Sequence, residues 1–159
     1  MTKSKVTLAE KTRAERLLSA PAYTMANGRD SHDVACEVLS AAVGQSFERL
    51  HNAAHRAGMA AGNAAQPDPM TVIDSANGTA WTVPDGLCGF AWVKISARGS
   101  FARWALDCGL MRKSSVQPGA FLRVREFGQS VARKAAYAKA YAEHLGRAGI
   151  DATYGSRLD

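Results

Sequence analysis

The sequence lacks any long apolar segment. No apolar run approaches the roughly 18 residues that a membrane-spanning helix needs. The charged N-terminus also has no apolar stretch of the kind found in secretory signals. These absences predict a cytoplasmic protein without a membrane partner. With 159 residues, the chain is long enough for a domain with a core, since a domain of this size buries about 70% of its unfolded surface.

Cysteine is scarce. Cys36, Cys88 and Cys108 form no Cys-x-x-Cys pair, and an odd number of thiols suits a reducing compartment. We expect all three to be packed among apolar neighbours, as most unpaired cysteines are. The functional alternative is a nucleophile at Cys88, which follows a glycine turn and precedes a buried strand, with His144 downstream as a base. A Cys88-dependent enzyme is therefore kept as one of three functional hypotheses.

Signatures of metal, phosphate and cofactor sites are absent as well. The sequence contains no zinc-finger, helix-turn-helix or RNP motif, no glycine-rich phosphate loop and no dinucleotide fingerprint. His51 and His55 are four residues apart, which places two imidazoles on one face of a helix. The residues between them lack the glutamate of a metalloprotease helix, and no third ligand is evident. We expect two solvent-facing histidines, and neither a metal nor a cofactor.

The positive charge of the chain is concentrated in its C-terminal part. Residues 1–93 carry 8 Lys and Arg against 9 Asp and Glu, whereas residues 94–159 carry 12 against 5. A basic half of this kind indicates an acidic partner, and a nucleic acid is the first such partner. The cations that we expect to converge on one exposed surface are Arg112, Lys113, Arg123, Arg125, Arg133, Lys134 and Arg147.

Hydrophobic spacing predicts an α+β fold. A capping box at Thr7 predicts a short helical arm, and apolar residues at spacings of three and four predict a long helix over 31–62. We expect a helical N-terminal segment over residues 1–65 and a compact α+β domain over 66–159. That domain should follow a strand–helix–strand–helix–strand order with short crossovers. Its elements are predicted at 89–95, 100–108, 121–127, 131–146 and 150–154.

Alternation along the predicted strands assigns their faces. Phe121, Arg123, Arg125 and Phe127 share one side of the strand 121–127, which sets two arginines between two rings. This arrangement suits single-stranded nucleic acid, where bases stack on aromatic rings. The competing interpretation is that a face with two phenylalanines is buried. We also expect the rings around Trp92 and Trp104 to lie in the core, beneath the basic surface.

The long helix offers a second kind of surface. Leu39, Val43, Phe47 and Leu50 recur in a nearly heptad pattern, which is typical of a helix that packs against another helix. The second functional hypothesis is therefore a protein–protein interaction module. Its partner would be a host or virion protein, or a second copy of the chain.

Several motifs give the chain a family resemblance. They include C-G-F-A-W-V at 88–93, G-Q-S-V-A-R-K-A-A-Y-A-K-A at 128–140 and A-G-I-D-A-T-Y-G-S-R-L-D at 148–159. Over residues 50–159 the chain resembles a family of small proteins encoded by tailed bacteriophages and prophages. The resemblance implies a phage gene product made in the bacterial host cytoplasm. It favours a virion or DNA-associated component, or an effector against a host or defence protein.

Overall fold

The computed structural model describes residues 31–159, with side chains from residue 36 onward. The helical arm predicted from Thr7 lies outside the described residues. The chain divides into two compact units, Met1–Arg49 and Leu50–Asp159. The division falls within helix α2 (Ser31–Ala64), which runs two residues past its predicted end.

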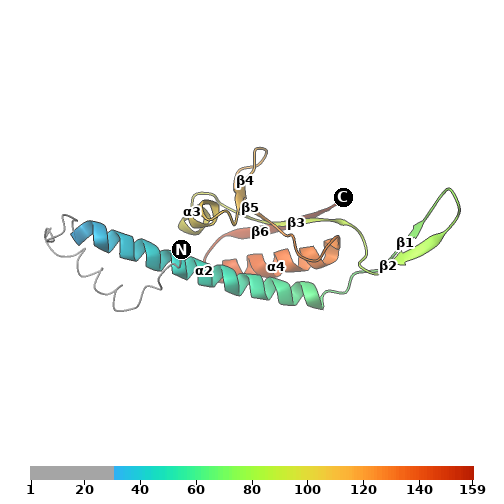
Figure 1. The fold of residues 1–159 in the computed structure, drawn as a ribbon, viewed down its shortest axis with the longest axis horizontal. Coiled ribbons are helices and arrows are strands. Elements are labelled where there is room, and N and C mark those ends of the chain that lie inside the picture. Colours follow the sequence, from blue (N-terminus) through green and yellow to red (C-terminus); the bar gives the residue numbers. More distant parts are fainter. Residues whose placement is uncertain (1–30) are drawn as a thin grey trace. The chain divides into compact units, whose positions relative to one another are not determined.

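The second unit combines helices with antiparallel sheets, so the predicted α+β class is confirmed. After α2 come the strands β1 and β2, the central strand β3, helix α3, the strands β4 and β5, helix α4 and the last strand β6 (Figure 1). Their bounds are β1 Met70–Ile73, β2 Ala80–Val83, β3 Gly89–Ile95, α3 Ser100–Asp107, β4 Arg112–Lys113, β5 Ala120–Arg123, α4 Val131–Arg147 and β6 Ala152–Leu158.

The main sheet has the strand order β4-β5-β3-β6, and every neighbouring pair in it is antiparallel. This differs from the predicted series of short crossovers. Because β5 and β6 are both antiparallel to β3, they run parallel to each other on either side of it. Helix α4 connects them and crosses the central strand, whereas β3 reaches β5 through α3 and the added strand β4.

The predicted strand 121–127 is shorter than its alternating pattern indicated. β5 ends at Arg123, and Phe127 has a positive φ of 65°, a left-handed conformation that ends regular extended structure. The expectation that Phe121, Arg123, Arg125 and Phe127 share one strand face is therefore wrong beyond Arg123. Alternation of side chains no longer applies once the backbone leaves the sheet.

The strands β1 and β2 form a separate two-stranded hairpin. Its turn begins at Asp74, whose N–H donates to the Thr79 carbonyl at 2.8 Å, and Gly78 takes a φ of 73° in it. Most side chains of this hairpin are exposed, including Ile73 at 67% and Trp81 at 50%. The hairpin therefore adds little to the core of the unit.

Helix α4 lies between the sheet and the C-terminal part of α2 (Figure 1). It packs on β3 and β6, where small and branched side chains such as Ala91 and Val93 are fully buried. Toward α2 it buries the rings of Tyr137 and Tyr141. A Cβ atom at Gly58 of α2 would lie 2.7 Å from the Tyr137 ring, so this glycine lets the helix accommodate the ring.

Candidate nucleic-acid interface

Strand register assigns the two faces of the main sheet. Gly89, Ala91, Val93 and Ile95 of β3 are buried, and a Cβ at Gly89 would meet the side chain of Val131 in α4. Helix α4 therefore covers this face. The alternate residues of β3 point to the opposite face, because successive side chains in a strand alternate. Among the closely packed pairs of elements in residues 31–159, none places a helix on that opposite face.

We call this second surface the open sheet face. Directly paired residues of neighbouring strands share a face, so the pairs Trp92–Arg123, Lys94–Phe121, Phe90–Arg157 and Trp92–Gly155 define its centre. The pair Arg112–Phe121 extends it onto β4. Its members are Phe90, Trp92, Lys94, Arg112, Phe121, Arg123, Thr153, Gly155 and Arg157.

The rings of this face are accessible. Phe90, Trp92 and Phe121 are half-buried rather than buried, and Arg123 and Arg157 are exposed. The expectation that the rings around Trp92 and Trp104 lie in the core is therefore wrong for Phe90 and Trp92, whereas Phe101, next to the Trp104 ring, is buried. The small alternate residues of β3 occupy the core instead, because α4 packs closely against that side of the strand.

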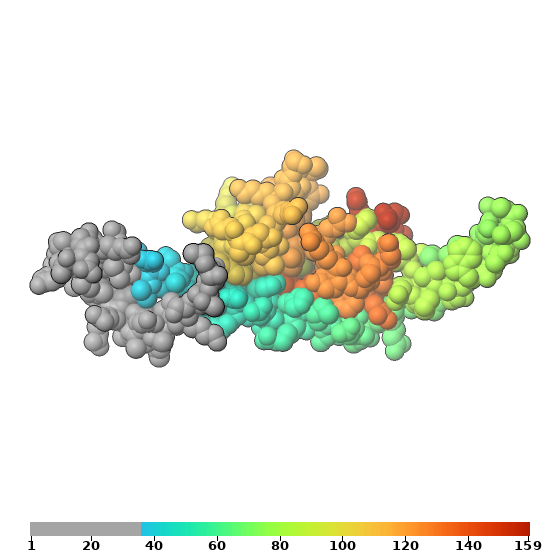
Figure 2. Space-filling view, in the orientation of Figure 1, coloured from blue at the N-terminus to red at the C-terminus, as the bar shows by residue number. Residues whose placement is uncertain are grey.

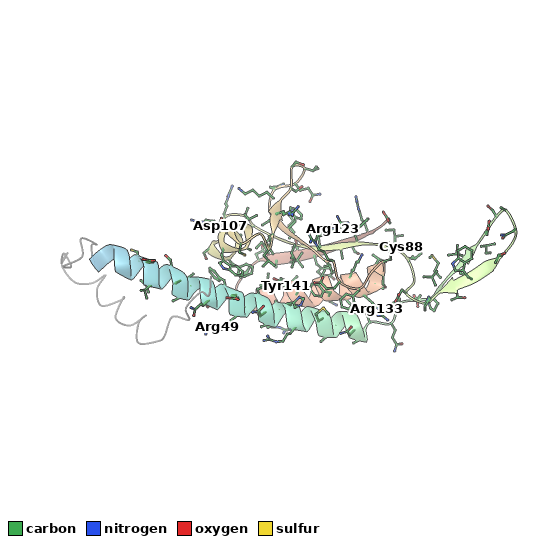
Figure 3. The ribbon with its side chains drawn as sticks, in the orientation of Figure 1. Arg49, Cys88, Asp107, Arg123, Arg133 and Tyr141 are labelled. Atoms are coloured by element: carbon green, nitrogen blue, oxygen red, sulfur yellow. The ribbon has the colours of Figure 1, made fainter. Side chains whose placement is uncertain are left out.

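Cations lie over the aromatic rings of the open sheet face. The guanidinium carbon of Arg123 is 4.5 Å from the Phe90 ring centroid, and that of Arg157 is 5.5 Å from it. The ammonium of Lys94 lies 5.7 Å from the Phe121 ring centroid. Such cation–π contacts orient the side chains without neutralising their charge. Within residues 31–159, none of these cations lies within ion-pair distance of a carboxylate. Figure 3 shows Arg123 on the strands above α4.

A basic cleft of about 490 Å³ opens at the β4–β5 edge of the sheet. Its walls come from α2, from the segment 109–114, from β5 with the loop after it, and from α4. In Figure 2 the segments around residues 110 and 122 stand beside each other above α2. Its charged and polar lining consists of Arg112, Lys113, Arg123, Arg125, Glu126, His51, His55 and Tyr137.

Two histidine–tyrosine pairs join α2 to α4 at this cleft. His51 Nδ1 lies 2.8 Å from the Tyr141 hydroxyl, and His55 Nδ1 lies 2.7 Å from the Tyr137 hydroxyl. The expectation of two solvent-facing histidines is therefore wrong. Both imidazoles face α4, which is covered on two sides and not on one.

Burial raises the pKa of both tyrosines well above the ordinary value of 10.0. For Tyr137 the negative charge of Glu126 raises the pKa further. For Tyr141 the further contributions come from Tyr137 and Cys108. Both hydroxyls therefore keep their protons at neutral pH, and that of Tyr137 belongs to the wall of the cleft.

The seven predicted cations separate into two groups. Arg112, Lys113, Arg123 and Arg125 meet at the basic cleft. The remaining three belong to α4: Arg133 lies 3.8 Å from a carboxylate oxygen of Asp85, and Arg147 is exposed in the last turn of the helix.

Lys134 corrects the predicted interface. Its side chain is only 6% exposed, and its ammonium donates a 2.9 Å hydrogen bond to the Gly89 carbonyl. A buried ammonium cannot reach the phosphate backbone of a polymer, so Lys134 has a structural role between α4 and β3.

Six members of the open sheet face were missing from the predicted interface: Phe90, Trp92, Lys94, Thr153, Gly155 and Arg157. A signal for them was present in β3. Its alternate residues Gly89, Ala91 and Val93 are small enough to accept a closely packed helix, which leaves the bulky residues for the other side. The sequence alone did not show which of the two faces of β3 is buried.

The predicted partner-binding residues of α2 keep some exposure. Val43 is 47% exposed, and Leu39, Phe47 and Leu50 are partly buried. Their spacing places them on one stripe of the helix, as the heptad pattern predicted.

The Cys88–His144 pair is not assembled. Cys88 forms an isolated bridge with Ser130, at the N-terminal end of α4. His144 lies near the other end of that helix, fourteen residues on, which corresponds to about 20 Å at the rise of an α-helix. A hydrogen bond between the thiol and this imidazole is excluded at that separation. Figure 3 shows Cys88 and Arg133 at the same end of helix α4.

In the described part of the chain no three His, Cys, Asp or Glu side chains are placed to hold a metal ion. Nor does any helix there have the length and apolarity to cross a membrane.

No family model, curated protein or solved structure matches this chain.

Proposed function

We propose that the chain is a non-catalytic module that binds single-stranded nucleic acid on its open sheet face. The observation that carries this proposal is the combination of three half-exposed rings, Phe90, Trp92 and Phe121, with unpaired cations on one antiparallel sheet. Bases of a single strand stack on aromatic side chains, while Lys and Arg follow the phosphates.

The geometry favours a single strand over a duplex. Neighbouring strands of a sheet are about 4.8 Å apart, so rings on adjacent strands can contact successive unpaired bases. In a duplex the faces of the bases are stacked on one another and are not available to these rings. The resemblance to tailed-phage proteins supports the same direction, with the bacterial host cytoplasm as the place of action.

A binding measurement with matched charge reversals tests the proposal. Fluorescence anisotropy compares a labelled single strand of about 12 nucleotides with its duplex at low salt. Arg157→Glu on the open sheet face should weaken binding of the single strand by about tenfold or more. Arg147→Glu makes the same change in net charge at the end of α4 and should have a much smaller effect. Equal effects of the two substitutions, or no binding at low salt, would reject the proposal.

A second candidate function is docking to a host or virion protein, or to another copy, through α2. The observation that favours it is the exposure of Val43 on the stripe that Leu39, Phe47 and Leu50 also form. An apolar side chain in the centre of such a stripe is typical of a helix that packs on a partner. Light scattering of the purified chain tests self-association: Val43→Asp should convert an oligomer to a monomer, whereas Ala41→Asp, on the opposite and exposed side of the helix, should not. A wild-type chain that is monomeric at all concentrations would reject the second copy as the partner.

A further inference from the structure

The basic cleft lies where the open sheet face ends. Arg112, Phe121 and Arg123 belong to both. Leu122, which also lines the cleft, points to the face that α4 covers. Since the cleft contains residues of both faces, it lies around the edge of the sheet. β4 pairs only with Phe121 and Ala120, so the rest of β5 forms this edge. A single-stranded nucleic acid that lies across the open sheet face would therefore reach the cleft with one of its ends.

The charge of the cleft exceeds what one internal phosphate requires. Four cations, Arg112, Lys113, Arg123 and Arg125, line it, and Glu126 is its one carboxylate among the described residues. A phosphodiester within a strand carries a single negative charge. A terminal phosphomonoester carries about −1.5 to −2 at neutral pH and offers three strong acceptor oxygens. Guanidinium groups bind such an anion with parallel hydrogen bonds.

The arrangement of these cations also differs from that of a groove. Cations that follow successive phosphates are spread along a track, whereas these four converge from β4, from β5 and from the loop after it on one volume of about 490 Å³. The helical wall with His51, His55 and Tyr137 bounds the same cleft. Imidazole and phenol groups supply further hydrogen-bonding partners for phosphate oxygens.

We propose that the basic cleft binds the terminal phosphate of a single-stranded nucleic acid whose bases lie on the open sheet face. The inference rests on the proposed function and adds to it a preference for strand ends. Lys113 and Arg125 are the cations that belong to the cleft and not to the open sheet face, so they separate end recognition from general binding.

The test varies only the chemical groups at the ends of the single-stranded nucleic acid. Four ligands of the same sequence and of about 12 nucleotides are compared by anisotropy competition: 5′-phosphorylated, 3′-phosphorylated, with hydroxyls at both ends, and circularised. One phosphorylated form should bind about tenfold more tightly than the hydroxyl form, in keeping with an added charge-assisted contact. The form that gains identifies the end, and the circle should bind no more tightly than the hydroxyl form.

The outcomes separate the inference from the function on which it rests. If all four ligands bind with equal affinity, the end-binding inference is overturned and the proposed function stands. If none binds, both are overturned. The double substitution Lys113→Gln with Arg125→Gln should abolish the preference for the phosphorylated end and leave affinity for the circle within about twofold. Lys139→Gln with Arg147→Gln, an equal loss of charge on exposed positions of α4, should leave the preference intact. If the double variant of Lys113 and Arg125 still preferred the phosphorylated end, the inference would be overturned. This comparison requires that both double variants unfold at the wild-type temperature. If the cleft variant is destabilised, the single substitution Lys113→Gln replaces it.

Discussion

The indole of Trp92 lies directly over Gly155 of the neighbouring strand. A Cβ atom at residue 155 would come 2.7 Å from the ring atom Cζ2, closer than such atoms approach one another. The absent side chain lets the indole lie low over the edge strand β6. Because Trp92 stands at the centre of the open sheet face, Gly155 helps to set the position of the ring on which a base would stack.

Gly155→Ala should therefore weaken nucleic-acid binding although it removes no contacting group. The added methyl group displaces the indole, and each stacked base contributes about 1–3 kcal/mol to binding, so a loss of about fivefold or more is expected in anisotropy titrations. Gly146→Ala is the matched control, because a Cβ at Gly146 in α4 would meet no atom within 4 Å. Equal affinity of the two variants would show that the position of Trp92 does not matter for binding.

The burial of Lys134 gives a second prediction, on charge. Lys134→Met and Arg123→Met each remove one positive charge, but only the Arg123 side chain is exposed on the open sheet face. Arg123→Met should weaken single-strand binding by about tenfold and reduce the slope of log affinity against log salt by about 0.7, the loss of roughly one phosphate contact. Lys134→Met should leave both quantities unchanged at temperatures where the variant is folded. A loss of salt dependence in Lys134→Met would mean that the lysine reaches solvent.

The helices could be predicted closely from the sequence, whereas the faces could not. α3 and α4 begin where residues 100 and 131 were expected, since Gly, Ser and amphipathic spacing mark such positions locally. The covered side of β3 depends on what packs against it. Alternation gives β3 two faces, one with Phe90 and Trp92 and one with Ala91 and Val93. The second face is the buried one, because α4 packs closely only against small side chains.

The candidate site was predictable only in part, for a related reason. Charge bias was sufficient to indicate Arg112, Lys113, Arg123 and Arg125, which the fold brings together. The burial of Lys134 depends on its contact with Gly89 of β3, 45 residues away in the chain. β5 ends at Arg123, and the sequence also carries no marker such as Asn or Gly for the left-handed backbone at Phe127.

The crossing of α2 and α4 gives a third prediction. Alanine is a better helix former than glycine by about 1 kcal/mol, so Gly→Ala in an unobstructed helix should stabilise the protein. At Gly58 the new methyl group would lie 2.7 Å from the Tyr137 ring, and overpacking of this kind costs about 1–3 kcal/mol. Gly58→Ala should therefore lower the free energy of unfolding measured in urea, while Gly146→Ala should leave it equal or higher. A stabilised Gly58→Ala variant would mean that the two helices are not held at this distance.

The histidine–tyrosine pairs give the fourth prediction, on pH. Burial raises the pKa of Tyr137 and Tyr141 in the folded chain, whereas in the unfolded chain they ionise around the ordinary value of 10.0. The folded state therefore holds its protons more tightly. Its stability from this source is complete below pH 10.0 and is lost as the pH rises above that value, because the unfolded chain then releases protons that the folded chain keeps. Each tyrosine should contribute a slope of about −1.4 kcal/mol per pH unit.

Urea unfolding in the alkaline range separates this effect from the titration of lysines. Tyr137→Phe and Tyr141→Phe each lose a hydrogen bond to a histidine, so each should lower stability at neutral pH by about 1 kcal/mol. Above pH 10.0 the order changes: the double variant lacks both ionisable hydroxyls, and its stability should fall less steeply than that of the wild type, by about 2.7 kcal/mol per pH unit. Each single variant should recover about half of that difference. If the wild type and the double variant lost stability in parallel, the two phenols would have to ionise in the folded chain as readily as in the unfolded one, and the buried contact between α2 and α4 would be refuted.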